Sequence, residues 1–423
     1  MSAEVEPSVS PAAYVRTLVL AAALGVPVAF AAVLFETAVH DLTQLVWEEI
    51  PDGLGWDAPA SWYVVLVPAA AGLLVAAATR LPGGGGHAPL EGLGVGMVRP
   101  LELVSILPAG LATLSFGLVL GPEAPLIALG LALGALAVRV LHEGRASGEL
   151  LALAGAFAAI STLFGGPLPA ALLLFEALAA SGKIPAQALG RALLPGFVAA
   201  GTGTLVFTGV EDWPGLEQTS LTLPSLPAYA AVRLEDIAWS AVVAVAAAGV
   251  VVVTLRGARE LAARASARPA TALVGAGLLV GALAVAYRAA VDRPVDYVLF
   301  SGQGSLAEVI GEGSASVLVL LVVAKGLAYA LSLAAAFRGG NVFPALILGV
   351  ALGALFANVL PGYELTPAIT AGIAASAAAV LRMPFFAVLI AALLVGAAGA
   401  ETVVIAILAA ALGWIVALAD ARR

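Results

Sequence analysis

The sequence predicts an all-α protein that crosses the membrane several times and consists of two repeated halves of inverted topology with broken, re-entrant helices. Three observations support this prediction. Of the 423 residues, 62% are hydrophobic and 11% are charged, which is more apolar than a water-soluble domain. The apolar residues form long runs, as spanning helices of about 20 residues require, whereas a β-barrel would show short alternating segments. The same Gly- and Pro-containing pattern occurs once in each half.

The apolar runs give the expected helices in chain order. They fall at residues 14–36, 62–80, 101–120, 124–141, 150–164, 168–180, 186–208, 237–255, 270–290, 316–336, 342–360, 366–380, 385–399 and 402–419. Several are shorter than the roughly 17 residues that a spanning helix needs. Short hydrophobic segments interrupted by Gly or Pro are typical of helices that enter the membrane partway and end at a central site.

Charges between these runs predict the orientation of the chain. Residues 36–61 and 209–236 are mainly acidic and are read as loops, whereas 255–269 contains four arginines and the chain ends in two more. Because Lys and Arg accumulate on the cytoplasmic side, we expect 255–269 and both termini in the cytoplasm and the acidic loops outside. The expected organisation is a disordered tail at 1–13, a first membrane repeat at 14–210, an extracellular connection at 211–236, a second repeat at 237–419 and a short cytoplasmic C-terminus at 420–423, without a soluble regulatory domain.

The repeat is visible as corresponding breaks in the two halves. In the first half "GPEAP" (121–125) precedes "FGGPLPAALLLFEAL" (164–178), and Gly121 lies 46 residues before Pro167 (167 − 121). In the second half "GGNVFP" (339–344) precedes "LRMPFFAVLIAALL" (381–394), and Gly340 lies 44 residues before Pro384 (384 − 340). Each half therefore has a Gly/Pro break that opens a helix, then a helix headed by proline, which favours two structural repeats. Chance recurrence among 47 Gly and 25 Pro is the alternative.

Helices that begin inside a membrane favour a bound anion. Their first-turn N–H groups have no intrahelical acceptor and carry the positive end of the helix dipole, and lipid offers no acceptor. An anion supplies both an acceptor and a negative charge. Four such starts, in "GPEAP", "GGPLP", "GGNVFP" and "RMP", with a fifth candidate in "PGGGGHAPLEG" (82–92), predict a path for a dehydrated inorganic anion that is coordinated mainly by the backbone.

Glu123 stands at one of these helix starts in an otherwise apolar run. A deprotonated carboxylate can take the place of an anion there, and a protonated one can leave. Two like charges about 4 Å apart repel by roughly 4 kcal/mol at an effective dielectric constant of ~20, so the carboxylate and a permeant anion should compete. Isolated acids in membrane segments are functional-site candidates. The alternative is a solvated carboxylate that caps the first turn of a helix.

Four motifs occur in the order known from one transporter family. "GPEAP", "FGGPLPAALLLFEA" (164–177), "GGNVFPALILG" (339–349) and "GGGHAPLEG" (84–92) resemble the motifs of the CLC family of chloride channels and proton-coupled chloride antiporters, over nearly the whole chain. The resemblance places Glu123 at the gating glutamate and implies a CLC-type fold, a homodimer in the cell membrane, and transport of chloride with or without protons. It implies anion contacts, mainly from backbone N–H groups, at Gly85, Gly86, Gly121, Pro122, Ala124, Asn341, Val342 and Phe343.

Several positions depart from the family pattern. The serine whose hydroxyl contacts the central anion falls on Gly85, Pro122 replaces a basic residue, and "GAAGAETVVIA" (396–406) lacks the family's central-site tyrosine. Both hydroxyl ligands of the central site are therefore expected to be missing, which favours uncoupled or poorly coupled anion movement. "FRGGNVFP" (337–344) also resembles the fluoride-exporting branch, so fluoride is the alternative anion, although that branch keeps a basic residue at the position of Pro122.

Two further acids are candidates for a second step in a proton path. The family's internal glutamate aligns near Glu211, for which an exposed acidic loop is the alternative role. Glu401 lies where the tyrosine is missing, and a charge in the first turn of a helix is the alternative there.

Composition argues against other classes of function. The chain has no cysteine, and its three histidines lie far apart, so neither a metal site nor a cofactor is expected. The net charge of −8 is scattered along the chain and suggests no nucleic-acid partner. An enzyme is not expected, because neither H-E-x-x-H nor G-x-S-x-G occurs. A membrane scaffold that transports nothing is the remaining alternative of another class.

Overall fold

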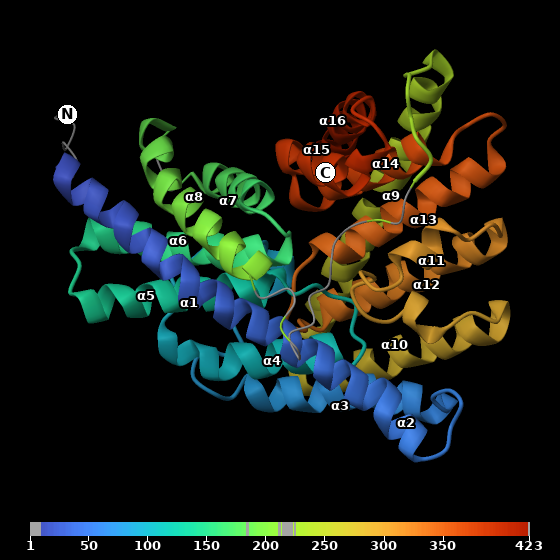
Figure 1. The fold of residues 1–423 in the computed structure, drawn as a ribbon. Helices are drawn as coiled ribbons and strands as arrows, with labels where there is room; N and C mark the ends of the chain where they lie inside the picture. Colours follow the sequence, from blue (N-terminus) through green and yellow to red (C-terminus); the bar gives the residue numbers. More distant parts are fainter. Residues whose placement is uncertain (1–9, 183–185, 210–212, 214–222, 224–225, 422–423) are drawn as a thin grey trace. The chain divides into compact units, whose positions relative to one another are not determined.

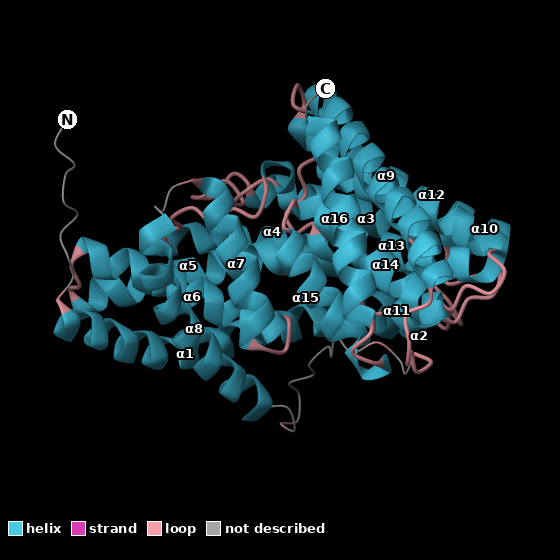
Figure 2. Ribbon diagram, turned by 90° about the horizontal axis from the view of Figure 1, so that it is seen from above, coloured by secondary structure: helices cyan, strands magenta, loops and turns pink. Residues whose placement is uncertain are grey.

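The computed structural model describes residues 10–182, 186–209, 213, 223 and 226–421. Among these residues Figure 2 shows helices and loops only. The α-helices are α1 (Pro11–Gln44), α2 (Ile50–Gly53), α3 (Ser61–Ala78), α4 (Leu103–Ser115), α5 (Glu123–Leu141), α6 (Arg145–Leu163), α7 (Pro167–Ser181), α8 (Ala186–Gly209), α9 (Leu234–Ala265), α10 (Pro269–Val291), α11 (Leu306–Ile310), α12 (Ala315–Ala334), α13 (Val342–Val359), α14 (Leu365–Leu381), α15 (Pro384–Val395) and α16 (Thr402–Ala421). Shorter helical turns are η1 (Leu45–Glu49), η2 (Pro89–Glu91), η3 (Pro100–Glu102), η4 (Val295–Tyr297) and η5 (Gly396–Ala398).

The helices have the lengths and the surface of a membrane protein. Within the described part of the chain, eight helical segments are long and apolar enough to cross a membrane, and several shorter apolar helices lie between them. Large apolar side chains such as Val19, Leu66 and Val253 are exposed on the outside of the helices. Lipid is as apolar as these side chains, so this surface suits a bilayer. The prediction of an all-α polytopic protein with short, broken helices is confirmed.

Both ends of the chain are more helical than expected. The tail predicted at 1–13 ends earlier, because α1 begins at Pro11 and the Oγ atom of Ser10 accepts a hydrogen bond from the N–H of Ala13 (3.2 Å). Serine at the cap and proline in the first turn favour a helix start. At the other end α16 continues to Ala421, and Asp420 forms ion pairs with Arg256 and Arg259. Residues 1–9 and 422–423 lie outside the described residues.

The acidic segment 36–61 is mostly helix, which corrects the loop predicted there. Helical structure continues from α1 through η1 and α2 to Gly53, because neither Gly nor Pro occurs between residues 36 and 50. Trp47 is buried, and its indole N–H donates to the carbonyl of Ser115 (3.0 Å). The acidic side chains of Asp41 and Glu48 lie on the exposed side. Asp41 and Glu48 therefore lie on the exposed face of a helix, and their charge does not indicate a loop. Most of the connection predicted at 211–236 lies outside the described residues.

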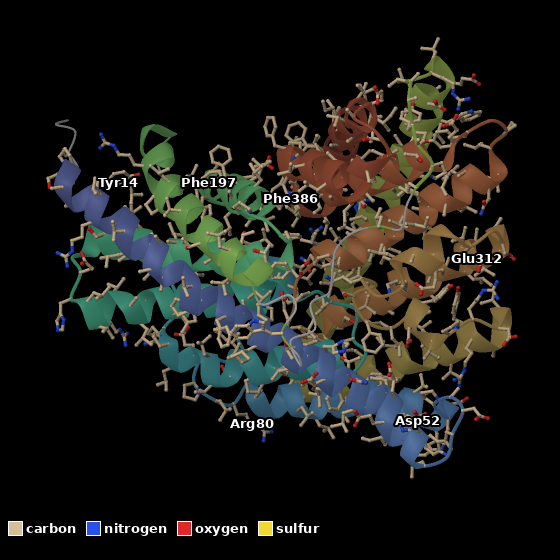
Figure 3. The ribbon with its side chains drawn as sticks, in the orientation of Figure 1. Tyr14, Asp52, Arg80, Phe197, Glu312 and Phe386 are labelled. Carbon is tan, nitrogen blue, oxygen red and sulfur yellow. The ribbon has the colours of Figure 1, made fainter. Side chains whose placement is uncertain are left out.

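The chain forms two compact units. The first comprises residues 1–36, 95–103 and 126–218, and the second comprises 37–94, 104–125 and 219–423. In Figure 3, Tyr14 marks the start of α1 in the first unit and Glu312 marks the loop between α11 and α12 in the second. Packing thus divides the chain differently from the repeats expected at 14–210 and 237–419, because α1 and α5 each contribute to both units.

The order of helices nevertheless repeats. Figure 1 labels the run α5, α6, α7 and α8 and the run α13, α14, α15 and α16. In chain order the two runs correspond, because each third helix begins at a proline. Gly130 of α5 faces the backbone of Gly155 in α6, and Gly349 of α13 faces the backbone of Gly372 in α14, so that a Cβ atom at either position would meet the neighbouring helix. Small residues permit such close approach of membrane helices. Gly349 follows Gly130 by 219 residues (349 − 130), an offset that recurs at the functional site.

Helix α12 holds the turn at 295–299 through one buried lysine. Lys325 is completely buried, and its Nζ atom donates to the carbonyls of Tyr297 (3.0 Å), Val298 (3.3 Å) and Leu299 (2.9 Å). Carbonyls at the end of a helical turn have no N–H donor within the turn. Burying such a carbonyl without a hydrogen bond is unfavourable. Lys325 therefore fixes this turn to α12.

We expect Lys325→Met to lower the free energy of unfolding by about 3 kcal/mol, because three buried carbonyls lose their donor. Thermal unfolding of the purified protein in detergent measures this effect. Leu321→Met, at another fully buried position of α12, is the matched control and should cost less than about 1.5 kcal/mol. Equal losses in the two variants would contradict the assigned role of Lys325.

Candidate anion site

Two helix starts meet at a short backbone bridge in the second unit. Gly121 precedes α5 by two residues, and Gly340 precedes α13 by two residues. The N–H of Gly121 donates to the carbonyl of Gly340 (2.9 Å), and the N–H of Gly340 donates back to the carbonyl of Gly121 (2.6 Å). The pairing is antiparallel. It brings the first residues of α5 and α13 to one place.

Two buried hydroxyl groups fix this arrangement reciprocally. Thr113 of α4 accepts a hydrogen bond from the N–H of Arg338 (3.1 Å), in the segment before α13. Ser332 of α12 accepts one from the N–H of Val119 (3.1 Å), in the segment before α5. Each hydroxyl also donates to the carbonyl four residues earlier in its own helix. Thr113 and Ser332 are 219 residues apart (332 − 113), so the paired segments are related by a local pseudo-two-fold.

Glu123 breaks this symmetry, because the equivalent residue in the other half is Val342 (342 − 123 = 219). The Glu123 side chain is completely buried, and its Oε1 atom accepts hydrogen bonds from the N–H groups of Val342 (3.1 Å) and Phe343 (3.2 Å). Its Oε2 atom is buried without a hydrogen-bond partner. First-turn amides of a helix favour an anionic partner, and at α13 that partner is the Glu123 carboxylate. Of the alternative role, the burial contradicts the solvation, whereas the two hydrogen bonds are those of a cap on the first turn of α13.

Glycine makes room for this carboxylate. A Cβ atom at Gly121 would stand 2.7 Å from the carboxyl carbon of Glu123, and one at Gly340 would overlap its Oε2 atom. The two glycines of the bridge therefore allow the backbone to approach the acid more closely than any other residue would.

The remaining residues expected around "GPEAP" differ in what they can donate. The N–H of Gly121 is used by the bridge, and Pro122 has no N–H at all, which corrects its inclusion as a donor. Ala124 lies in the first turn of α5, where an N–H has no acceptor within the helix.

The glycine run at 83–86 begins no α-helix, which corrects the fifth expected helix start. All four glycines have positive φ angles, and only the short turn η2 follows. The N–H of Gly85 donates to the Oγ atom of Ser105 (3.0 Å), and the N–H of Gly86 donates to the carbonyl of Gly83 (3.0 Å). Both amides expected to face an anion therefore have protein acceptors.

Asn341 and Arg338 connect the start of α13 to this glycine-rich loop. The Nδ2 atom of Asn341 donates to the carbonyl of Pro89 (2.7 Å), and the guanidinium of Arg338 donates to the carbonyl of Gly84 (3.0 Å). The backbone carbonyl of Asn341 accepts a hydrogen bond from the hydroxyl of Tyr329 (3.2 Å). The side chain of Asn341 thus has a structural contact, and its backbone belongs to the site.

The other predicted positions that the structure describes take no part in these hydrogen bonds. The starts of α7 at Pro167 and α15 at Pro384 are where the sequence predicts them. Glu401 directly precedes α16, and its carboxylate lies beside Gly399, which is the place of the helix-terminal charge considered as the alternative. Glu211 lies outside the described residues.

Comparisons with known proteins show the family of this chain. The family model described as voltage gated chloride channel matches residues 88–418, a range that contains the Glu123 site. The chain belongs to this chloride channel family. It is 30% identical over 375 residues to YfeO of Escherichia coli strain UMN026, a predicted ion-transport protein, covering 86% of this chain and 84% of YfeO.

The fold predicted from the CLC resemblance is confirmed by solved structures. This member of the chloride channel family matches a slow cyanobacterial Cl⁻/H⁺ antiporter with a TM-score of 0.79, at 19% identity, over 96% of this chain and 94% of that one. It matches a CLC-type fluoride/proton antiporter with a TM-score of 0.72, at 17% identity, over 96% of both chains.

Three residues that contact the backbone around Glu123 were not predicted from the sequence, namely Thr113, Ser332 and Tyr329. A single buried hydroxyl carries no motif, so nothing local marks these residues. The repeat could have found two of them, because Thr113 and Ser332 each lie ten residues before the start of the next helix of their half (123 − 113 and 342 − 332).

We expect Gly121→Ala to destabilise the protein by about 1–3 kcal/mol, because the new methyl group meets the Glu123 carboxylate. In a Glu123→Ala background the same change should cost much less, since the atoms it meets are gone. Unfolding of the four proteins of this double-mutant cycle in detergent measures the coupling. A cost of Gly121→Ala that is the same in both backgrounds would show that the carboxylate does not lie against the bridge.

Proposed function

We propose that this protein moves an inorganic anion across the membrane past the start of α13, with Glu123 as its gating and proton-coupling residue. The observation that carries the proposal is the carboxylate of Glu123 on the amides of Val342 and Phe343. These amides would bind a permeant anion in the same way. The deprotonated carboxylate therefore blocks the site, and an anion enters when the carboxylate leaves.

The unpartnered Oε2 atom of Glu123 supports the coupling to protons. A proton can bind to Oε2 without first breaking the hydrogen bonds that reach Oε1. Neutralising the carboxylate weakens those bonds, because hydrogen bonds to an ionised acceptor are roughly twice as strong as neutral ones. Protonation therefore favours departure of the side chain and access of the anion.

Chloride is the proposed anion, and fluoride is the second candidate. Val342 at the start of α13 is the feature shared with the fluoride-exporting branch, whereas Pro122 stands where that branch has a basic residue.

We further propose a homodimer with cytoplasmic termini. Arg256, Arg259 and Arg264 lie toward the end of α9, and Lys and Arg near a span end indicate the cytoplasmic side.

Reconstituted protein in liposomes tests this function directly. Chloride and fluoride efflux are recorded together with internal pH for the wild type, Glu123→Ala, Glu123→Gln and the control Glu308→Gln, which alters an exposed acid of α11. We expect both Glu123 variants to lose proton movement and to change anion efflux severalfold, and the control to match the wild type. Anion efflux with stoichiometric proton movement in the wild type identifies an antiporter, and efflux without protons identifies a channel. No flux of either anion would leave the scaffold alternative.

The pH dependence of anion flux is a separate prediction. In the wild type, flux should rise as the pH on both sides of the membrane is lowered, because protonated Glu123 vacates the amides of α13. Glu123→Gln cannot be deprotonated, so its flux should stay constant over the same pH range. Initial rates of chloride efflux at symmetrical pH values measure both curves. A wild-type curve as flat as that of the glutamine variant would rule out gating by Glu123.

A further inference from the structure

Tyr329 is joined to the Glu123 site through one peptide group. Its side chain is completely buried in α12, and its hydroxyl donates to the carbonyl of Asn341 (3.2 Å). That carbonyl and the N–H of Val342 are the two ends of the same peptide group, and the N–H donates to Oε1 of Glu123 (3.1 Å). Phenol, peptide and carboxylate therefore form a continuous chain of hydrogen bonds.

A peptide group transmits such a contact because it is planar. In a trans peptide the C=O and N–H bonds point in opposite directions, and the described residues contain no cis peptide bond. Holding the carbonyl of Asn341 toward Tyr329 thus holds the N–H of Val342 toward the anion site. A hydrogen bond to the carbonyl also polarises the peptide and strengthens its N–H as a donor.

The carbonyl of Asn341 does not need Tyr329 to be satisfied. Asn341 is the N-cap residue of α13, and the carbonyl of an N-cap residue accepts the first hydrogen bond within the helix. A carbonyl oxygen has two lone pairs, and the phenol occupies the second. Removing the hydroxyl should therefore leave α13 intact and change chiefly the strength and direction of the Val342 amide.

The contacts that hold the paired segments occur in both halves, whereas the Tyr329 contact occurs in one. Thr113 and Ser332 correspond to each other at the offset of 219 residues, as do Gly121 and Gly340. At the same offset the counterpart of Tyr329 is Gly110 (329 − 219), which has no hydroxyl. The paired segment before α5 forms without such a phenol. The tyrosine is present only on the side whose amides bind the acid.

We propose that Tyr329 is a positioning residue for anion recognition, which orients and strengthens the Val342 amide that the permeant anion uses. This inference rests on the proposed function, because it assumes that anion and carboxylate share that amide. In effect it assigns to α12 a hydroxyl that acts on the anion through the backbone.

The test measures anion affinity without the competing carboxylate. In a Glu123→Ala background, the chloride concentration that gives half-maximal efflux is determined with and without Tyr329→Phe. We expect the half-maximal concentration to rise about threefold to tenfold, the size of one lost hydrogen bond, and the maximal rate to stay within about twofold. Tyr287→Phe is the matched control, because Tyr287 is also buried and its hydroxyl faces a backbone carbonyl, that of Val317 (3.5 Å). It should change neither parameter.

A second variant should shift the half-maximal chloride concentration in the opposite direction. Replacing Tyr329 by a ring-fluorinated tyrosine keeps its shape and makes the hydroxyl a stronger donor, so the half-maximal chloride concentration should fall. This variant decides the question if Tyr329→Phe does not fold. Chloride efflux that depends on Glu123 but has the same half-maximal concentration in all Tyr329 variants overturns this inference alone. Absence of anion flux in every variant overturns the proposed function and this inference together.

Discussion

The first-turn amides of α13 are the constraint on which the rest of the site depends. A helix that begins inside a membrane protein has N–H groups that neither the helix nor lipid can satisfy. Here the N–H groups of Val342 and Phe343 are satisfied by Glu123, which lies 219 and 220 residues earlier in the chain. A ligand from so far away must be brought to the helix start by the backbone itself. The Gly121–Gly340 bridge does this, and glycine is required because any Cβ atom would meet the carboxylate.

Contacts that occur in both halves hold the paired segments together, whereas the residues that act at the start of α13 occur in one half only. The reciprocal contacts of Thr113 and Ser332 have the same spacing in both halves. Each paired segment is therefore held by a hydroxyl group from the other half. The acid and Tyr329 occur in one copy each. Two identical halves would have first-turn amides at both helix starts, without a side chain that could bind to these amides or leave them. In the proposed mechanism, the single acid at one helix start makes the occupancy of the site depend on a proton.

Sequence reasoning was accurate where the physics is local. Gly and Pro breaks predicted the starts of α5, α7, α13 and α15, because these residues act on the backbone where they stand. It erred where charge or glycine has two uses. The acids of 36–61 lie on a helix, and the glycines at 83–86 form a turn with positive φ angles. The contact of Tyr329 could not be predicted, because its counterpart in the other half is Gly110 and a single hydroxyl that binds a distant backbone atom leaves no period or motif in the sequence.

The missing side-chain hydroxyls do not leave the site without hydroxyl support. At the position where the family resemblance places a serine, the N–H of Gly85 donates to Ser105, and at α13 the phenol of Tyr329 acts on the carbonyl of Asn341. In both places the hydroxyl contacts backbone, so in the proposed mechanism the anion itself would contact amides. Amides in a fixed helix turn discriminate by the spacing of their N–H groups, because they cannot rotate to suit an ion as a free hydroxyl can. Selectivity between chloride and fluoride should therefore depend on how rigidly the Val342 and Phe343 amides are held. Tyr329 donates to the carbonyl end of the peptide group that carries the Val342 amide, so ion preference and hydrogen bonding by Tyr329 should change together.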